Sequence, residues 1–369
     1  MEPVYLDTAA TSWPKPPEVA AAMERALREG GTYGRAATPR SWNATAEVEK
    51  CRDLLAAEIG VGTPERVAFT LNATQALNAV LFGLELRDCE ILVSPLKHNS
   101  VSRPVERLVR AFGCVARTMP ADADGRIRCD ELRRAVTPKT KLAVVCHMSN
   151  VNGLLQPLRE IKEALGDVPL LADASQSAGH AEIRADEWKL DGLAFSGHKG
   201  LLGPTGTGAF FWRRPEELVP PLFGGTGSRS ESAEMPEALP DRWQGGTPNI
   251  VGIAGLKAAL EHRPRPLLSR GDWTAFLDEL ERRPRVRRLL RAANPAEQGP
   301  VVSILREGES VSSLAMRLLR DHGIETRPGL HCAPAAHRFL GSFPDGAVRV
   351  SIGPWTTARE LETLLGALS

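Results

Sequence analysis

The stretch Leu193-Ala194-Phe195-Ser196-Gly197-His198-Lys199-Gly200 places an apolar run directly before small residues and a lysine. The run Leu170-Leu171-Ala172-Asp173 has the same layout one segment earlier, because its apolar residues end at a carboxylate. Short, continuously apolar runs of this kind predict parallel strands that are buried on both faces. Ligands bind at the carboxyl edge of such a sheet, so the two strands should bring Asp173 and Lys199 to one site.

The surrounding sequence alternates between apolar runs and amphipathic stretches from about residue 66 to residue 212. Strands are predicted at 66–70, 91–93, 141–146, 170–172 and 193–195, and helices at 73–86, 101–112 and 157–165. This alternation predicts an α/β fold in which helices cover both faces of a mostly parallel sheet.

The pattern changes after about residue 250. A helix is predicted at 250–262, and a Pro- and Arg-rich stretch follows to residue 291. Beyond it we expect strands at 301–305 and 347–352 and helices at 311–322 and 358–368. Strands with helices on one side predict a smaller α+β C-terminal domain. We therefore place a large domain at 15–255 and a small domain at 1–14 and 256–369.

The bulk composition is that of an ordinary globular protein. The 369 residues are 42% hydrophobic and 25% charged, and the net charge of +1 favours neither a nucleic acid nor a membrane as partner. No stretch approaches the roughly 20 apolar residues that span a bilayer, and the N-terminus lacks a signal-peptide pattern. The six cysteines form no CxxC pair, so neither a metal site nor a disulfide framework is indicated, and we expect a reducing cytoplasm.

Several residues at predicted strand ends carry chemistry. Lys199 can form a Schiff base with an aldehyde, although a surface lysine in a glycine-rich turn would look the same in isolation. Asp173 can pair with a protonated ring nitrogen or simply cap a helix. Near Asn72 and Thr74, free N–H groups at a helix start suit a phosphate, although capping alone would explain both residues. His98 follows a strand and can stack on an aromatic ring.

Together these residues resemble the class V aminotransferase family, of pyridoxal-phosphate fold type I. The similarity is greatest to the cysteine desulfurases and selenocysteine lyases of the SUF type, and it runs almost the whole length of the chain. The matching motifs are Tyr5-Leu6-Asp7-Thr8-Ala9-Ala10-Thr11-Ser12, Asn72-Ala73-Thr74, His98-Asn99-Ser100, Ser149-Asn150-Val151, Asp173-Ala174-Ser175-Gln176, Ser196-Gly197-His198-Lys199, Gly246-Thr247-Pro248-Asn249 and Arg327-Pro328-Gly329-Leu330-His331-Cys332-Ala333. Each motif alone is weak, and their number and order carry the resemblance.

The resemblance implies pyridoxal 5′-phosphate as the cofactor, held in a large domain with a mostly parallel seven-stranded sheet. Lys199 would bind the cofactor covalently and later shuttle a proton, while Asp173 would pair with the ring nitrogen. His98 would stack on the ring face and assist proton transfer. The other implied cofactor contacts are Ala73 at the phosphate-binding turn, Thr74, Ser196 and His198 on the phosphate, Gln176 on the ring 3′-oxygen, and Asn150 near it.

The resemblance also assigns the substrate and subunit contacts. Arg327 would clamp the substrate α-carboxylate in a bidentate pair, with Asn150 beside it. Thr247 matches a residue that reaches the phosphate of the neighbouring subunit. The resemblance therefore implies a homodimer with shared active sites.

Cys332 decides which reaction the resemblance implies. It follows Arg327 by five residues, and a thiol beside Arg327 and His331 would have a lowered pKa and attack a substrate sulfur. The implied activity is conversion of L-cysteine to L-alanine, with a persulfide on Cys332 that passes its sulfur to an acceptor protein or small thiol. The cysteines that we expect to be structural are Cys51, Cys89, Cys114, Cys129 and Cys146.

The sequence departs from the family in ways that leave other reactions open. Leu330 stands where SUF-type members more often carry a histidine, residues 30–35 lack a histidine that many relatives place near the substrate, and the region 263–300 is short. A selenocysteine lyase, a C–S β-lyase, an epimerase and an aminotransferase remain alternatives. A catalytically inactive scaffold is another alternative. A nucleotide-binding enzyme is disfavoured, because no GxGxxG motif lies between a first strand and helix.

Overall fold

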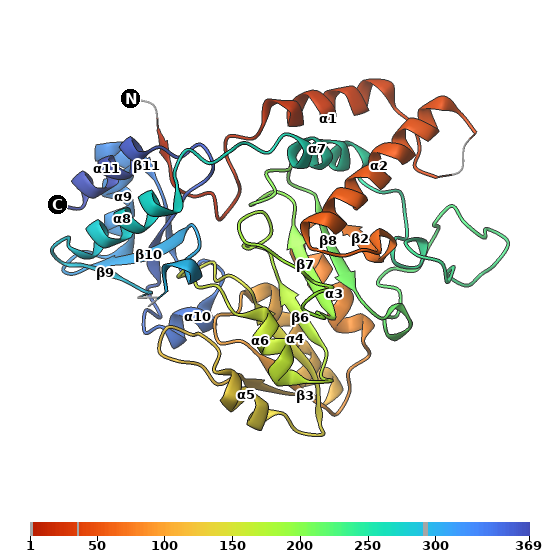
Figure 1. The fold of residues 1–369 in the computed structure, drawn as a ribbon, viewed down its shortest axis with the longest axis horizontal. Helices are drawn as coiled ribbons and strands as arrows, with labels where there is room; N and C mark the ends of the chain where they lie inside the picture. The colour runs from red at the N-terminus through yellow and green to blue at the C-terminus, as the bar shows by residue number, and fades with distance from the viewer. Residues whose placement is uncertain (1–2, 35–36, 291–293) are drawn as a thin grey trace.

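The computed structural model describes residues 3–34, 37–290 and 294–369. The last residues of the segments 30–35 and 262–291 discussed above lie outside these ranges. A sheet with the strand order β2-β8-β7-β6-β5-β3-β4 forms the centre of the molecule (Figure 1). Its strands are β2 (Val67–Thr70), β3 (Glu90–Val93), β4 (Val115–Thr118), β5 (Thr140–Cys146), β6 (Leu170–Asp173), β7 (Gly192–Ser196) and β8 (Gly208–Trp212).

The predicted mostly parallel, seven-stranded sheet is confirmed. Strands β4, β3, β5, β6 and β7 pair in parallel, whereas β8 runs antiparallel to both β7 and β2. Asp173 is the last residue of β6, and Ser196 is the last residue of β7. Because these strands are parallel neighbours, their ends lie at the same edge of the sheet, as the sequence predicted.

Helices cover both faces of this sheet. The helices of this part of the chain are α1 (Pro17–Glu29), α2 (Pro39–Glu58), α3 (Ala73–Gly83), α4 (Asn99–Phe112), α5 (Cys129–Ala135), α6 (Leu158–Leu165) and α7 (Ile250–Glu261). Successive residues of β5 point to opposite faces: Leu142 packs into the core with α3 and α4, and Ala143 into the core with α2 and α6. Burial on both faces explains why the central strands are continuously apolar.

The C-terminal part of the chain forms a second, antiparallel sheet with the order β12-β13-β10-β9 (Figure 1). Its strands are β9 (Val286–Arg288), β10 (Val301–Arg306), β12 (Arg327–Gly329) and β13 (Ala347–Ser351), and its helices are α8 (Arg270–Glu281), α9 (Val311–His322), α10 (Pro334–Phe339) and α11 (Ala358–Ala367). The N-terminal strand β1 (Val4–Tyr5) pairs in parallel with β11 (Ile324–Glu325). Strand β1 therefore belongs to the C-terminal unit, and Val4 and Leu6 lie in its core.

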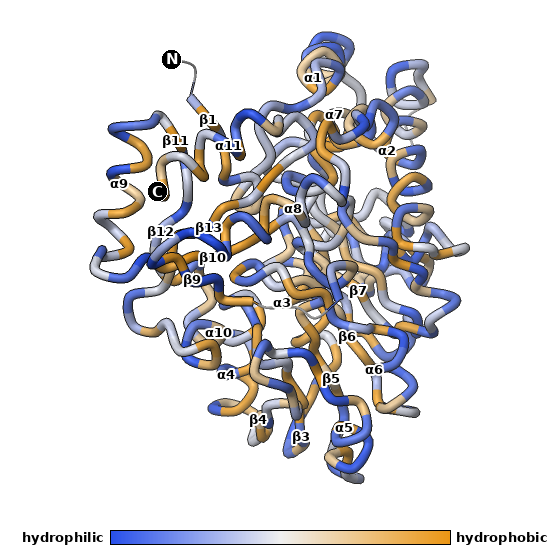
Figure 2. The backbone as a smooth tube through the Cα atoms, turned by 60° about the vertical axis from the view of Figure 1, so that its left-hand side comes forward, coloured by the Kyte–Doolittle hydropathy of each residue, from blue (hydrophilic) through white to orange (hydrophobic). Residues whose placement is uncertain are grey.

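Amphipathic helices complete this unit. Along α9, hydrophilic and hydrophobic turns alternate in Figure 2, and the buried face carries Leu314 and Leu318. The predicted domain boundary at residue 255 falls inside α7, so the division of the chain into domains stays a prediction. Among the described residues, no helix is both long and apolar enough to cross a membrane.

Candidate active site

A cavity of about 320 Å³ opens where the parallel strands end. Its walls include every predicted site residue except Thr247. These lining residues are Ala73, Thr74, His98, Asn150, Asp173, Gln176, Ser196, His198, Lys199, Arg327 and Cys332. The fold thus brings together side chains from β6, from the loop after β7, from the start of α3 and from the C-terminal unit.

Lys199 lies in the turn that follows β7, where the N-terminal segment holds the backbone in place. The Ser12 amide donates to the His198 carbonyl at 2.9 Å, and the Thr11 hydroxyl donates to the same oxygen at 3.1 Å. Burial lowers the pKa of the Lys199 amine, and the negative charge of Asp173 opposes this shift. A lysine with a lowered pKa releases its proton more readily, which suits it to attack an aldehyde.

Asp173 presents a buried carboxylate to the cavity. One of its oxygens accepts hydrogen bonds from the Ser175 amide, at 3.0 Å, and from the Ser175 hydroxyl. The residue is 4% exposed. The other carboxylate oxygen is left to receive a proton donor inside the cavity, as a pairing with a protonated ring nitrogen requires.

His98 is held in one tautomer. Its Nδ1 accepts from the Ser100 amide at 3.0 Å and lies 2.7 Å from the Ser100 hydroxyl. A backbone amide can only donate, so the proton of the neutral ring sits on Nε2. Burial lowers the pKa of His98 to about 4, so the ring is neutral at physiological pH. The Ser100 hydroxyl also meets the Thr74 hydroxyl at 3.0 Å, which links His98 to the start of α3.

The start of α3 is built to approach a ligand closely. The Asn72 side chain caps the helix by accepting from the Gln75 amide at 3.0 Å, and the Ala73 amide donates to Ser196 Oγ at 3.1 Å. A Cβ at Gly208 would lie 2.8 Å from Cα of Asn72, so only glycine lets β8 pack against this turn. Helix N-termini attract anions through their free N–H groups and their dipole.

Three buried polar atoms of residues that line the cavity have no hydrogen-bond partner among the described residues, namely Asn150 Oδ1, His198 Nδ1 and Arg349 Nε. Buried polar atoms without partners are rare, and a polar ligand would satisfy them. Together with the Lys199 amine, the Asp173 carboxylate and the start of α3, they fit pyridoxal phosphate, the cofactor that the family implies. Gln176 also lines the cavity, and its side-chain nitrogen donates to the Ala9 carbonyl at 2.8 Å. Its predicted contact with the ring oxygen stays a prediction.

The sequence did not single out Arg349, which lines the same cavity. Arg349 Nη2 donates to Asp7 Oδ1 at 2.7 Å, and Arg327 pairs with Asp7 Oδ2 at 2.7 Å. The Arg349 side chain is 4% exposed and the Arg327 side chain 51% exposed, so Arg349 is the more deeply placed cation. The sequence did contain a feature that could have identified Arg349, because this arginine interrupts the otherwise apolar strand β13 at a buried position.

Cys332 is exposed and lines the cavity, whereas Cys51, Cys89, Cys114 and Cys146 are buried and Cys129 is half-buried. Cys146 also lines the cavity, which the sequence did not predict.

The ring of His331 bonds to groups other than the Cys332 thiol, and its predicted effect on that thiol stays a prediction. Both ring nitrogens of His331 are engaged elsewhere, with the Arg327 carbonyl at 2.9 Å and with His337 at 3.2 Å. Burial lowers the pKa of His331 to about 3, so the ring carries no positive charge at neutral pH. The charge of Arg327 is paired with Asp7.

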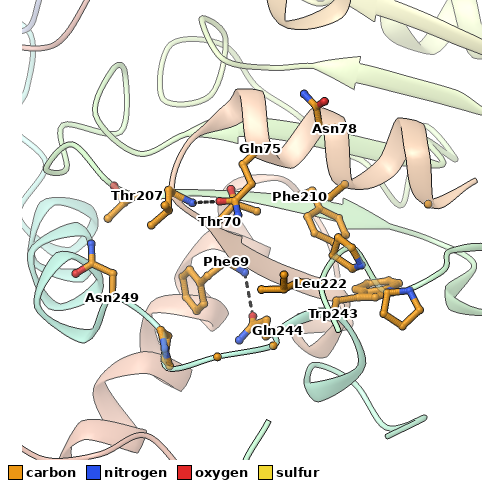
Figure 3. A pocket seen from close by; sticks show the side chains of 18 of the residues that line it. Phe69, Thr70, Gln75, Asn78, Thr207, Phe210, Leu222, Trp243, Gln244 and Asn249 are labelled. Atoms are coloured by element: carbon orange, nitrogen blue, oxygen red, sulfur yellow. Dashed lines mark hydrogen bonds between the residues drawn. The ribbon is translucent and has the colours of Figure 1, made fainter. Parts of the chain in front are cut away.

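Thr247 lines a second cavity, of about 460 Å³, that lies beside the end of β2 and along α3 (Figure 3). Phe69, Phe210 and Trp243 give this cavity apolar walls, and Gln244 Oε1 accepts from the Phe69 amide at 2.9 Å. Thr247 is therefore absent from the walls of the cavity around Lys199 in its own chain. Its predicted contact with the cofactor phosphate of a neighbouring subunit stays a prediction.

Comparison with known proteins identifies the family. The model of the family "Aminotransferase class-V" matches residues 4–364. A probable cysteine desulfurase of Aeropyrum pernix is 34% identical, over 99% of this chain and 93% of its own length. A probable cysteine desulfurase of Pyrococcus abyssi is 32% identical, over 100% of this chain and 94% of its own length.

Solved structures agree with this assignment. A cysteine desulfurase of Thermococcus onnurineus NA1 superposes with a TM-score of 0.89 at 30% identity, and the match covers 99% of this chain and 93% of that one. A cysteine desulfurase of Escherichia coli in an S-sulfonic acid form gives 0.86 at 26% identity, with the same coverage of 99% and 93%. The chain with the cavity around Lys199 therefore belongs to the class V aminotransferase family.

Proposed function

We propose that this chain is a pyridoxal-phosphate-dependent cysteine desulfurase, which converts L-cysteine to L-alanine and holds the removed sulfur as a persulfide on Cys332. The observation that carries the proposal is that an exposed cysteine lines the same cavity as the half-buried Lys199 and the buried Asp173. A family fold alone would not distinguish among the reactions that the family performs. The thiol in this cavity favours sulfur transfer over epimerisation or transamination.

Asp173 and Lys199 have separate roles in the first half-reaction. When bound, pyridoxal phosphate supplies an electron sink for the charge that remains after the substrate loses its α-proton. Asp173 holds a proton on the ring nitrogen, and the amine of Lys199 takes the α-proton of the substrate. The lowered pKa of Lys199 keeps a fraction of that amine neutral and able to accept the proton.

Arg349 and Arg327 hold the α-carboxylate of the substrate. Asp7 lies between them and fixes both guanidinium groups, and Arg349 Nη1 also donates to the Asn150 carbonyl at 3.2 Å. Arg349 Nε has no partner among the described residues, so this buried donor is available to a carboxylate. This assigns to Arg349 a share of the binding that the sequence gave to Arg327 and Asn150.

Cys332 performs the second half-reaction. Its thiolate attacks the sulfur of the substrate, an S–S bond forms, and the bond between the substrate sulfur and Cβ breaks. The electron pair of the broken bond stays with Cβ, which is then protonated. L-cysteine and the enzyme thiol thus become L-alanine and an enzyme persulfide, with no external oxidant or reductant. The exposure of Cys332 lets an acceptor protein or small thiol reach the persulfide.

The quaternary arrangement is also part of the proposal. A homodimer would bring Thr247 of one subunit to the cofactor phosphate of the other, which explains why Thr247 lies outside its own chain's cofactor cavity. Six cysteines without a disulfide support a reducing compartment such as the cytoplasm.

Product analysis with a matched pair of cysteine variants tests the proposal. The purified protein, loaded with pyridoxal phosphate, should yield L-alanine and a persulfide from L-cysteine. Cys332→Ser should lose both products but keep the borohydride-reduced adduct on Lys199, because the cofactor site is intact. Cys129→Ser, which changes a half-buried cysteine outside the cavity, should behave like the wild type. Pyruvate in place of alanine would instead indicate a β-lyase, and full turnover by Cys332→Ser would rule out the persulfide route.

A further inference from the structure

Behind Cys332, a chain of hydrogen bonds runs from the protein interior to the loop that carries the thiol. His331 Nε2 donates to the Arg327 carbonyl at 2.9 Å, and His331 Nδ1 lies 3.2 Å from His337 Nε2. His337 Nδ1 lies 2.7 Å from the Ser342 hydroxyl. His337 is fully buried, so it touches neither the solvent nor the cavity around Lys199.

The direction of each bond in this chain is determined. A carbonyl can only accept, so His331 carries its proton on Nε2, and its Nδ1 is an acceptor. His337 must then donate from Nε2, which leaves its own Nδ1 to accept from the Ser342 hydroxyl. Burial lowers the pKa of His331 to about 3 and of His337 to about 4, so both rings are neutral at physiological pH.

The loop that these hydrogen bonds support has an unfavourable backbone conformation. His331 and Cys332 are consecutive non-glycine residues with φ of 49° and 54°, in the left-handed region. Such residues persist only where the surroundings hold them firmly. The carbonyl of His331 accepts from Asn150 Nδ2 at 2.8 Å, and the carbonyl of Cys332 accepts from the Asn99 amide at 2.8 Å. Hydrogen bonds to the two backbone carbonyls therefore hold the loop on the side of the cofactor cavity. The His331 ring holds it on the side of the protein interior.

We propose that His337 is a positioning residue for sulfur transfer: through His331 it holds the left-handed turn that presents Cys332 to the substrate. His337 touches neither the thiol nor the cavity, so it acts only through His331. This inference rests on the proposed desulfurase function. It predicts that loss of His337 slows the step that needs Cys332 and spares the steps that need only Lys199.

The test compares His337→Ala with His337→Gln, whose side-chain nitrogen can still donate to His331. Single-turnover persulfide formation should fall about 10- to 100-fold in His337→Ala, the loss expected from a misplaced reacting group. The KM for L-cysteine and the absorbance change of the bound cofactor on adding L-cysteine should stay at wild-type values. His337→Gln should recover most of the rate. His262→Ala, an exposed histidine elsewhere, is the control and should match the wild type.

Three results would overturn the inference. Persulfide formation at the wild-type rate in His337→Ala would show that the ring is not needed. A loss in His337→Gln as large as in His337→Ala, or a loss of the cofactor absorbance change, would indicate a general structural role. Should His337→Ala fail to fold, Ser342→Ala replaces it, since it removes the donor that fixes the tautomer of His337. Ser342→Ala should then slow persulfide formation.

A second measurement does not depend on the reaction. The Asn99 amide, which donates to the Cys332 carbonyl, should exchange its hydrogen faster in His337→Ala than in the wild type. The Ser100 amide, which donates to His98 within the same helix start, should be unaffected. Unchanged exchange at Asn99 would contradict the inference. If the wild-type protein forms no persulfide from L-cysteine, the proposed function is wrong. Hydrogen exchange at the Asn99 amide would still decide whether His337 positions the loop.

Discussion

Arg349 shows what a single buried charge contributes to the site. Its guanidinium lies almost completely out of the solvent, and Asp7 balances its charge at 2.7 Å. A lysine at this position would keep the charge but lose the planar set of donors that matches a carboxylate. We expect Arg349→Lys to lower kcat/KM for L-cysteine about 10- to 100-fold, through a higher KM, because hydrogen bonds to charged groups contribute about 1.5–3 kcal/mol. Steady-state kinetics of the cofactor-loaded enzyme measures this change.

The matched control for Arg349→Lys is Arg320→Lys, since Arg320 is exposed on α9 and lies outside the cavity. It should leave kcat and KM unchanged. An Arg349→Lys enzyme with the wild-type KM would assign the carboxylate to Arg327 and Asn150, as the sequence had predicted.

The sequence predicted residues at strand ends better than residues that meet across the fold. Asp173 stands at the end of one short apolar strand and Lys199 just after the next, and these strands are neighbours in the sheet, so the geometry of the sheet brings the two residues close together. The Asp7–Arg349 pair joins residues 342 positions apart, and no local pattern reports such a contact. The interpretation of His331 rested on its adjacency to Cys332 in the sequence. In the structure, its ring nitrogens bond to His337 and to the Arg327 carbonyl.

At the scale of elements, the capping of α3 links stability to cofactor binding. Asn72 and Ser310 are both N-caps that accept from a backbone amide, at 3.0 Å in α3 and 3.1 Å in α9. Replacing either by alanine should cost about 1 kcal/mol of unfolding free energy. Only Asn72→Ala should also weaken pyridoxal phosphate binding, because α3 begins at the cavity and α9 does not. Denaturant unfolding of the apoprotein and cofactor titration measure the two effects.

Equal cofactor affinities in Asn72→Ala and Ser310→Ala would mean that the start of α3 does not bind the phosphate. A loss of stability in Asn72→Ala without any change in affinity would assign Asn72 to capping alone, the other interpretation that the sequence allowed.

Most elements could be predicted where packing leaves a pattern in the sequence, and the missed ones either lack such a pattern or have it obscured by charged residues. The central strands are buried on both faces and were predicted to within a residue or two. Strand β4 is an edge strand whose four residues are all exposed, so it has no apolar run. Helix α8 and strand β9 lie in the stretch that we described only as Pro- and Arg-rich. Helix α8 buries Trp273, Phe276, Leu277 and Leu280, and this periodicity was obscured by the charged residues around it.

At the scale of the whole molecule, buried neutral histidines predict sensitivity to acid. Burial lowers the pKa of His147 and His331 to about 3, and of His98, His198 and His337 to about 4, whereas a histidine in the unfolded chain titrates near 6.5. The unfolded state therefore binds more protons between these values. Stability is fully present above about pH 6.5 and falls as the pH decreases toward 3–4.

This pH dependence can be measured for one histidine. For His147, the loss between pH 7 and pH 5 should be roughly 2 kcal/mol. Denaturant unfolding at the two pH values should show a smaller loss in His147→Gln than in the wild type. An identical loss in the two proteins would mean that His147 is not buried in its neutral form.

The bonds that join the two ends of the chain also order events in time. Asp7 is synthesised 342 residues before its partner Arg349. Strand β1 likewise waits for β11 before it can pair. The nascent polypeptide thus carries residues 4–7 without their partners until β11 and β13 have been synthesised. The substrate-binding half of the cavity therefore forms late, once the residues around Arg349 have left the ribosome.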